Sequence, residues 1–137
     1  MSGSLWRNIN KRLVRARKNI REANIPFDVP IGAALEKRLS SVLEVLYLLF
    51  NQGYHASSGN EVVRFELCEE AIRLTELIST HKSISQKSSV FALLALMYFN
   101  ASRFSSRLND VYDIIDLKNQ DRSKWDQNLI SRGLLFL

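Results

Sequence analysis

Residues 90–99 read VFALLALMYF, an uninterrupted apolar and aromatic run that gives the clearest indication of fold in this sequence. The second half of the segment 32–52, with Val45, Leu48 and Phe50, is also apolar on nearly all sides. Helices of this kind are expected in the middle of a bundle. The 137 residues include only five glycines and two prolines, whereas an all-β domain needs frequent turns. The predicted fold class is therefore all-α, with about five helices in orthogonal or bundle-like hairpins, tetratricopeptide-like stacking being one such arrangement.

Apolar residues at spacings of three and four predict where the helices lie. The predicted helices are Leu5–Ala23, Gly32–Gln52, Asn60–Thr80, Ser85–Arg107 and a fifth that begins near Asp121 or Ser123. We expect Gly53 to end the second helix as a left-handed cap, and Asn60 and Ser123 to act as N-caps. The predicted organisation is a basic helix at 1–24, a linker at 25–31 and a helical domain at 32–137.

Charge is distributed unevenly along the chain. Residues 1–21 carry seven of the 19 basic side chains and no acidic one, whereas the remaining residues carry 12 basic and all 14 acidic side chains. The predicted first helix thus combines an apolar stripe, which includes Leu13 and Ile20, with a basic remainder. Lysines and arginines grouped on one helix bind phosphates non-specifically by releasing counterions. Charge alone leaves nucleic acid, an acidic protein partner and a solvated surface open as alternatives.

Residues that metal or covalent chemistry requires are scarce. Cys68, the one cysteine, falls on the apolar stripe of the third predicted helix and is predicted to be a small core residue. His55 and His81 are isolated, and the sequence has neither the Glu-x-x-His pairs of a di-iron bundle nor a zinc-binding cluster. Glu66 and Glu70 share a helix face, but such pairs are common on solvated surfaces. We therefore expect no enzymatic activity, no cofactor and no metal site.

Neither a membrane span nor a signal peptide is predicted. The apolar stretches are far shorter than the roughly 20 residues of a membrane-spanning helix. Residues 1–7 lack a basic start followed by an apolar run. A single cysteine also excludes an internal disulfide. The expected localisation is cytoplasmic, with no membrane partner.

Several blocks occur in a distinctive order along the chain. They are KRLVRARKNIR at 11–21, IPFDVP at 25–30, LYLLFNQGY at 46–54, LCEEAIRL at 67–74, LLALM at 93–97, Ser102-Arg103 and QDRSKWD at 120–126. Over roughly residues 9–133 this order resembles the extracytoplasmic-function sigma factors of RNA polymerase, in the subgroup with a helical, tetratricopeptide-like C-terminal extension. Gln52 stands where that group usually has glutamate, in the motif Asn-Glu-Gly-Tyr.

This resemblance implies that residues 1–24 are the truncated end of the helix-turn-helix that reads the promoter. The side chains it places near the phosphate backbone are Lys11, Arg12, Arg15, Arg17 and Lys18. Residues 32–137 would then regulate the sigma factor or contact polymerase. The preceding sigma regions have no counterpart here, so we expect an excised C-terminal part or a shortened gene product that is not a sigma factor by itself. RNA polymerase and promoter DNA are the expected partners of the full-length protein.

Two further functions stay open at this point. The apolar stripe of the first helix could pair with a second copy, which predicts a homodimer. A small-molecule-sensing domain would instead use a pocket lined by Tyr54, Tyr98 and Trp125. The residues predicted for a pocket or an interaction surface are Asn51, Tyr54, Tyr98, Arg103, Asp121, Arg122 and Trp125.

Overall fold

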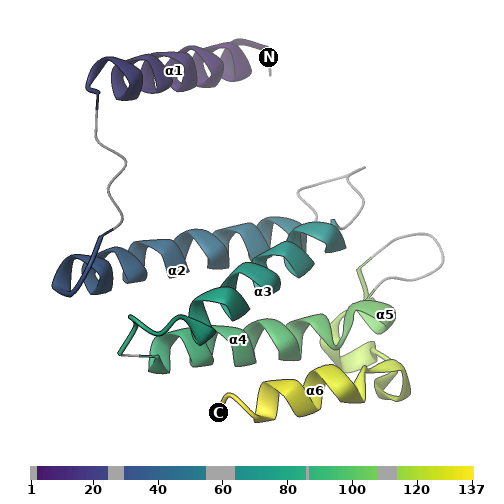
Figure 1. The fold of residues 1–137 in the computed structure, drawn as a ribbon. Helices are drawn as coiled ribbons and strands as arrows, with labels where there is room; N and C mark the ends of the chain where they lie inside the picture. The colour runs from purple at the N-terminus through teal and green to yellow at the C-terminus, as the bar shows by residue number, and fades with distance from the viewer. Residues whose placement is uncertain (1–2, 25–29, 55–63, 86, 108–113) are drawn as a thin grey trace. The chain divides into compact units, whose positions relative to one another are not determined.

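The computed structural model describes residues 3–24, 30–54, 64–85, 87–107 and 114–137, and these form an all-α protein without β-strands (Figure 1). The helices are α1 (Gly3–Glu22), α2 (Ala33–Tyr54), α3 (Phe65–Thr80), α4 (Ser88–Ala101), α5 (Phe104–Arg107) and α6 (Gln127–Leu134), with two short 3-10 helices, η1 (Leu117–Asn119) and η2 (Arg122–Lys124). The chain divides into two compact units, Met1–Pro30 and Ile31–Leu137. None of the described helices is long and apolar enough to span a membrane.

Unit 1 contains one described helix, α1, whose ends lie within two residues of the predicted ones. The amide of Ala23 still donates to the carbonyl of Asn19, at 2.9 Å, as in a regular helix. Asn24 then adopts a left-handed conformation with φ of 44°. Asparagine tolerates this conformation better than most residues, and it ends α-helices. The helix therefore stops at Asn24, before the prolines of the linker.

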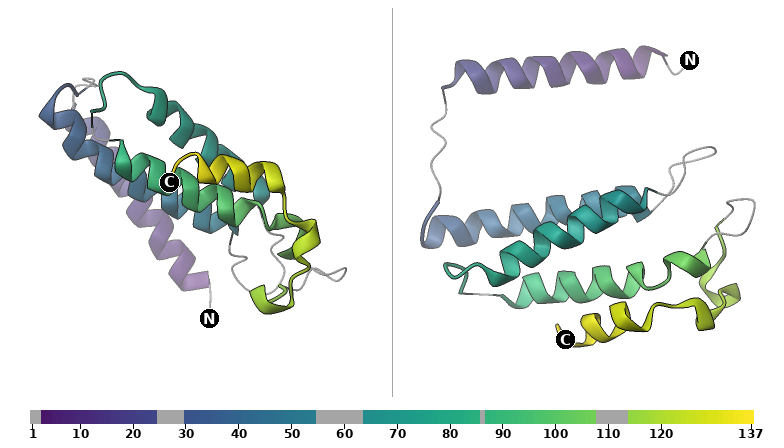
Figure 2. Two further views of the ribbon diagram at one scale, coloured as in Figure 1. Left: turned by 90° about the horizontal axis from the view of Figure 1, so that it is seen from below. Right: turned by 45° about the vertical axis from the view of Figure 1, so that its right-hand side comes forward.

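Unit 2 is a succession of helical hairpins. The chain reverses direction between consecutive long helices, so that α2, α3, α4 and α6 follow one another as antiparallel neighbours (Figures 1 and 2). The main contacts join α2 to α3, α3 to α4 and α4 to α6. The connection between α3 and α4, residues 81–87, is short, and connections of that length favour antiparallel packing of sequential helices. This arrangement agrees with the predicted all-α class.

The core of unit 2 forms around the run at 90–99, as its composition indicates. Its largest fully buried side chains are Tyr98, Leu94 and Met97. Met97 belongs to a hydrophobic cluster whose other buried members come from α2 and α3. Those members are Leu46, Phe50, Tyr54, Cys68 and Ala71. The prediction that α4 is a central helix is thus confirmed.

The matching prediction for α2 is wrong within unit 2. Its buried face consists of Leu43, Leu46 and Phe50, whereas Val45 is 63% and Leu48 58% exposed. The physical reason is the order of packing: α2 is the first helix of the stack and packs mainly against α3, so only one of its faces is covered by unit 2. Apolar composition alone does not distinguish an edge helix from a central one.

Gly53 does not end α2 as a left-handed cap. It lies inside the helix, which continues to Tyr54, and it is buried. A methyl group built on Gly53 would lie 2.6 Å from the carbonyl oxygen of Arg64 and 2.8 Å from the sulfur of Cys68. Glycine is therefore required here by the close approach of the residues that begin α3.

Two other predicted helix boundaries also differ from the structure. The segment predicted as one helix, Ser85–Arg107, is interrupted at Ser102. The Ser102 hydroxyl donates to the carbonyl of Phe99 at 2.8 Å. The Ser102 carbonyl accepts a hydrogen bond from the amide of Asp126, also at 2.8 Å. Ser123 is not an N-cap. Asp126 caps α6 instead, accepting from the amides of Asn128 at 2.9 Å and Leu129 at 3.1 Å. The predicted cap Asn60 lies outside the described residues.

Candidate functional site

The basic surface of α1 is the first candidate site. The five side chains predicted to lie near phosphates are all exposed: Lys11, Arg12, Arg15, Arg17 and Lys18. Lys11, Arg15 and Lys18 follow each other at spacings of four and three, which places them on one helix face. Lys18 forms an exposed ion pair with Glu22 at 3.6 Å. No other ion pair involves α1 within the part of the chain that the structure describes, so its positive charge is largely uncompensated.

The opposite face of α1 is apolar. Leu13, Ala16 and Ile20 recur at spacings of three and four and are exposed in unit 1. Arg12 and Arg17 border this stripe, because each lies next to it around the helix. The helix thus presents one apolar side and one cationic side, as its sequence predicts.

Around Tyr54 two arginines meet at the end of α2. The Arg107 guanidinium lies 3.5 Å from the centre of the Tyr54 ring and donates to the Tyr54 carbonyl. Arg103 donates to the Tyr54 hydroxyl at 2.7 Å and to the side-chain carbonyl of Asn100. A cation at the last carbonyl of a helix complements the helix dipole. The cluster therefore caps α2 and ties it to α4 and α5.

Among the predicted site residues, Tyr54 and Arg103 are brought together here, and Asn51 is partly buried one turn earlier on α2. Arg107 was not among the predicted site residues, although it is buried and has its pKa lowered chiefly by that burial. The available signal was its spacing of four from Arg103, which places both side chains over the same neighbour when the segment is helical.

Tyr98 belongs to a different cluster, between α3, α4 and α6. Its hydroxyl donates to the carboxylate of Glu76, which also accepts from Arg132. The Arg132 guanidinium lies 4.7 Å from the centre of the Tyr98 ring. Burial is the main cause of a raised pKa for Tyr98. These contacts border a cleft of about 220 Å³ and join three helices through one carboxylate.

The last predicted site residues lie in the segment before α6. The carboxylate of Asp121 accepts hydrogen bonds from the Ser123 hydroxyl at 2.7 Å and from the Ser123 backbone amide at 2.9 Å. Both bonds lower the pKa of Asp121. The Arg122 guanidinium lies 5.6 Å from the centre of the Trp125 ring. Trp125 lines a cleft different from that of Tyr98. Tyr98 and Trp125 therefore line different clefts rather than one pocket, and Tyr54 lines neither of these two clefts.

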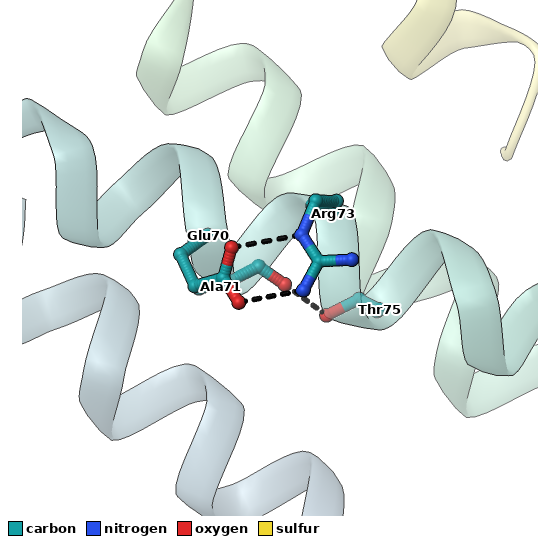
Figure 3. Close-up of polar contacts among 4 residues, drawn as sticks. All are labelled: Glu70, Ala71, Arg73 and Thr75. Carbon is teal, nitrogen blue, oxygen red and sulfur yellow. Dashed lines mark hydrogen bonds and ion pairs between the residues drawn. The ribbon is translucent and has the colours of Figure 1, made fainter.

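Glu66 and Glu70 do not act on each other as a carboxylate pair. Glu70 accepts two hydrogen bonds from Arg73, at 2.7 and 2.8 Å, and these bonds lower the pKa of Glu70 (Figure 3). On the same helix, the hydroxyl of Thr75 donates to the backbone carbonyl of Ala71. A bond from its own backbone amide and one from Arg64 lower the pKa of Glu66. A general acid needs a raised pKa, so neither carboxyl is tuned for that role.

Cys68 is confirmed as a small core residue. It is fully buried, and its thiol donates to the carbonyl of Phe50 at 3.3 Å. Burial raises the pKa of Cys68 to about 12, which keeps the thiol neutral. The exposed His81 ends α3, while His55 lies outside the described residues. Within the described ranges, no three histidine, cysteine, aspartate or glutamate residues form a group that could hold a metal.

Comparison with known proteins places the helices of unit 2 in a family. Residues 38–137, which include most of α2 and all of α3 to α6, match DUF6596, a family of unknown function. The chain belongs to the DUF6596 family.

The DUF6596 chain is also similar to uncharacterized protein R00370 of Rhizobium meliloti (strain 1021), with 33% identity over 129 residues. This alignment covers 94% of the present chain, and hence most of α1, but only 30% of the relative. The chain therefore spans about a third of that relative's length. No solved structure matches it.

Proposed function

We propose that this DUF6596 chain is the C-terminal interaction module of an extracytoplasmic-function-type RNA polymerase sigma factor. In this proposal α1 contacts the phosphate backbone of promoter DNA, and unit 2 is a helical body that regulates the sigma factor or contacts polymerase. The module acts by binding, and no bond is made or broken. The resemblance of the ordered sequence blocks to that sigma-factor subgroup supports the assignment.

The observation that carries the proposal is the separation of charge. Between residues 11 and 21 every charged side chain is basic, and these side chains are exposed. Ionised arginines and lysines with few carboxylate partners gain most from phosphate contacts, because little existing pairing must be broken. The remaining chain carries more acidic than basic residues and so adds no comparable attraction for DNA.

DNA binding by the full chain should depend steeply on salt. Five phosphate contacts correspond to a slope of about −4 to −5 in a plot of log affinity against log salt concentration. Changing Arg12, Arg15 and Arg17 to alanine together is expected to lower the magnitude of this slope by about 3 and to weaken binding at every salt concentration. Fluorescence anisotropy with a labelled DNA duplex measures both quantities.

A matched control removes three positive charges from exposed positions of unit 2. Lys37, Arg38 and Lys82 changed to alanine give the same net charge as the α1 variant. The control should retain the wild-type slope. Equal losses in the two variants would mean that net charge rather than α1 attracts DNA, and would refute the proposed interface.

Self-association is the alternative that a specific observation favours. The exposed stripe of Leu13, Ala16 and Ile20 is suited to pairing two copies of α1, since burying apolar area is favourable. This alternative predicts a light-scattering mass of twice the 15.8 kDa chain. Changing Leu13 and Ile20 to glutamate should then return the mass to that of one chain. A wild-type mass of one chain at working concentration rules the dimer out.

A further inference from the structure

A second cleft of unit 2 is lined by α4, the turn after it, η1, the residue after η2 and α6. Its volume is about 330 Å³. Three apolar side chains, Phe99, Leu117 and Ile130, form part of its wall. Clefts that take small ligands combine such apolar walls with a few polar groups that fix orientation.

One polar group of this wall lacks a partner. Trp125 lines the cleft, and its indole Nε1 is buried without a hydrogen-bond acceptor among the described residues. A buried donor left unpaired costs about 1–3 kcal/mol, so buried N–H groups in folded proteins nearly always have an acceptor. Among the described residues, no other buried side-chain nitrogen or oxygen lacks a hydrogen-bond partner. An acceptor oxygen that reached this N–H would recover this cost.

The charge beside the cleft is positive, and Arg103 has no carboxylate partner among the described residues. Arg103 also lines it, and the described hydrogen bonds of its guanidinium use only Nη2, with Tyr54 and Asn100 as neutral acceptors. The donors on Nε and Nη1 have no acceptor among the described residues. The guanidinium groups of Arg103 and Arg107 both lie over the Tyr54 ring. After burial, the nearby positive charge of Arg103 also lowers the pKa of Arg107. Two close guanidinium groups that pair with no carboxylate in the described part of the chain favour the arrival of an anion.

We infer that this cleft binds a small organic acid, with its carboxylate at Arg103, an oxygen accepting from Trp125 and an apolar body against Phe99, Leu117 and Ile130. A carboxylate fits better than a phosphate, because a guanidinium pairs well with it and the apolar wall favours a ligand with little remaining charge. The site lies wholly within unit 2 and uses no residue of α1. It would give the helical body a ligand through which to respond to a metabolite.

Nuclear magnetic resonance of the full chain tests this directly, because an indole N–H gives its own resonance. The chain has two tryptophans, and a Trp6→Phe variant leaves the signal of Trp125 alone. Phenylacetate is the probe, and phenylacetamide is its neutral counterpart of the same shape. We expect a saturable shift of the Trp125 resonance with phenylacetate, and binding at least about tenfold weaker with the amide, since charge-assisted bonds are the stronger ones.

Variants assign the contacts. Arg103→Gln removes the positive charge and should weaken phenylacetate binding about tenfold. Tyr54→Phe removes one hydrogen-bond acceptor of Arg103 but leaves the charge of Arg103 in place, so it should preserve binding. Lys118→Gln removes an exposed charge from η1 and should change affinity less than about twofold. If Arg103→Gln fails to fold, Ile130→Phe replaces it, because the larger ring narrows the cleft and should weaken binding.

Three results would overturn the inference. The Trp125 resonance could show no saturable response to phenylacetate. The neutral amide could bind as tightly as the acid. Lys118→Gln could weaken binding as much as Arg103→Gln, which would mean a diffuse attraction of anions to a basic surface. The DNA measurements do not bear on any of these outcomes, so the organic-acid site and the proposed DNA contact can fail separately.

Discussion

Replacing Leu94 with alanine is expected to lower the free energy of unfolding by about 3 kcal/mol. Leu94 lies in the middle of α4 and is 0% exposed. Its removal loses the transfer free energy of the missing carbon atoms and leaves a cavity, because a helix packed against α3 and α6 cannot collapse fully into the space. Urea unfolding followed by helical circular dichroism measures the change.

Leu96 is the matched control for Leu94. It lies two residues further along the same helix but is 44% exposed. Leu96→Ala should cost less than about 1 kcal/mol, since alanine favours the helix and no buried cavity is formed. If the two variants lost the same stability, α4 would not face the core in the observed orientation.

Replacing Gly53 with alanine is expected to lower the free energy of unfolding by about 2 kcal/mol. Helix propensity alone predicts the opposite sign, a gain of about 1 kcal/mol, because glycine is the poorer helix former. The new methyl group, however, would lie 2.6 Å from the backbone oxygen of Arg64 and 2.9 Å from the Leu67 side chain. Backbone cannot rotate away as a side chain can, so α2 and α3 must move apart, and such overpacking costs about 1–3 kcal/mol.

Gly133 offers the comparison for Gly53. It is also a buried helical glycine, in α6, but a methyl group there would meet the ring of Phe99, at 2.7 Å, rather than backbone. The partly buried ring can shift, so Gly133→Ala should cost less than Gly53→Ala in the same urea experiment. A stabilised Gly53→Ala variant would contradict the close approach of α2 and α3.

The helical class of the fold could be predicted because it depends on local patterns. Spacings of three and four located α1 to within two residues, and the run at 90–99 identified a buried helix. Which side of a helix is covered depends on contacts between distant residues, however. Val45 and Leu48 are as apolar as the core but are exposed in unit 2, since α2 is packed on one face only. The sequence has no local signal for that difference.

The polar clusters of unit 2 were harder to predict for the same reason. Glu76 meets Tyr98 across 22 positions and Arg132 across 56 positions of sequence. Arg107 reaches the end of α2 across 53 positions. No spacing rule within one helix connects such residues, because each pair forms only when separate helices pack. The charge of α1 is different: it is a property of one continuous segment and could be read directly from the sequence.

The most direct test of the proposed DNA contact is to map the backbone amide resonances of the full chain as a DNA duplex is added. We expect the largest changes within residues 11–24, where exposed basic side chains lie, and little change along α3. Changes confined to α3, α4 or α6, with α1 unaffected, would show that the basic helix is not the DNA-binding surface.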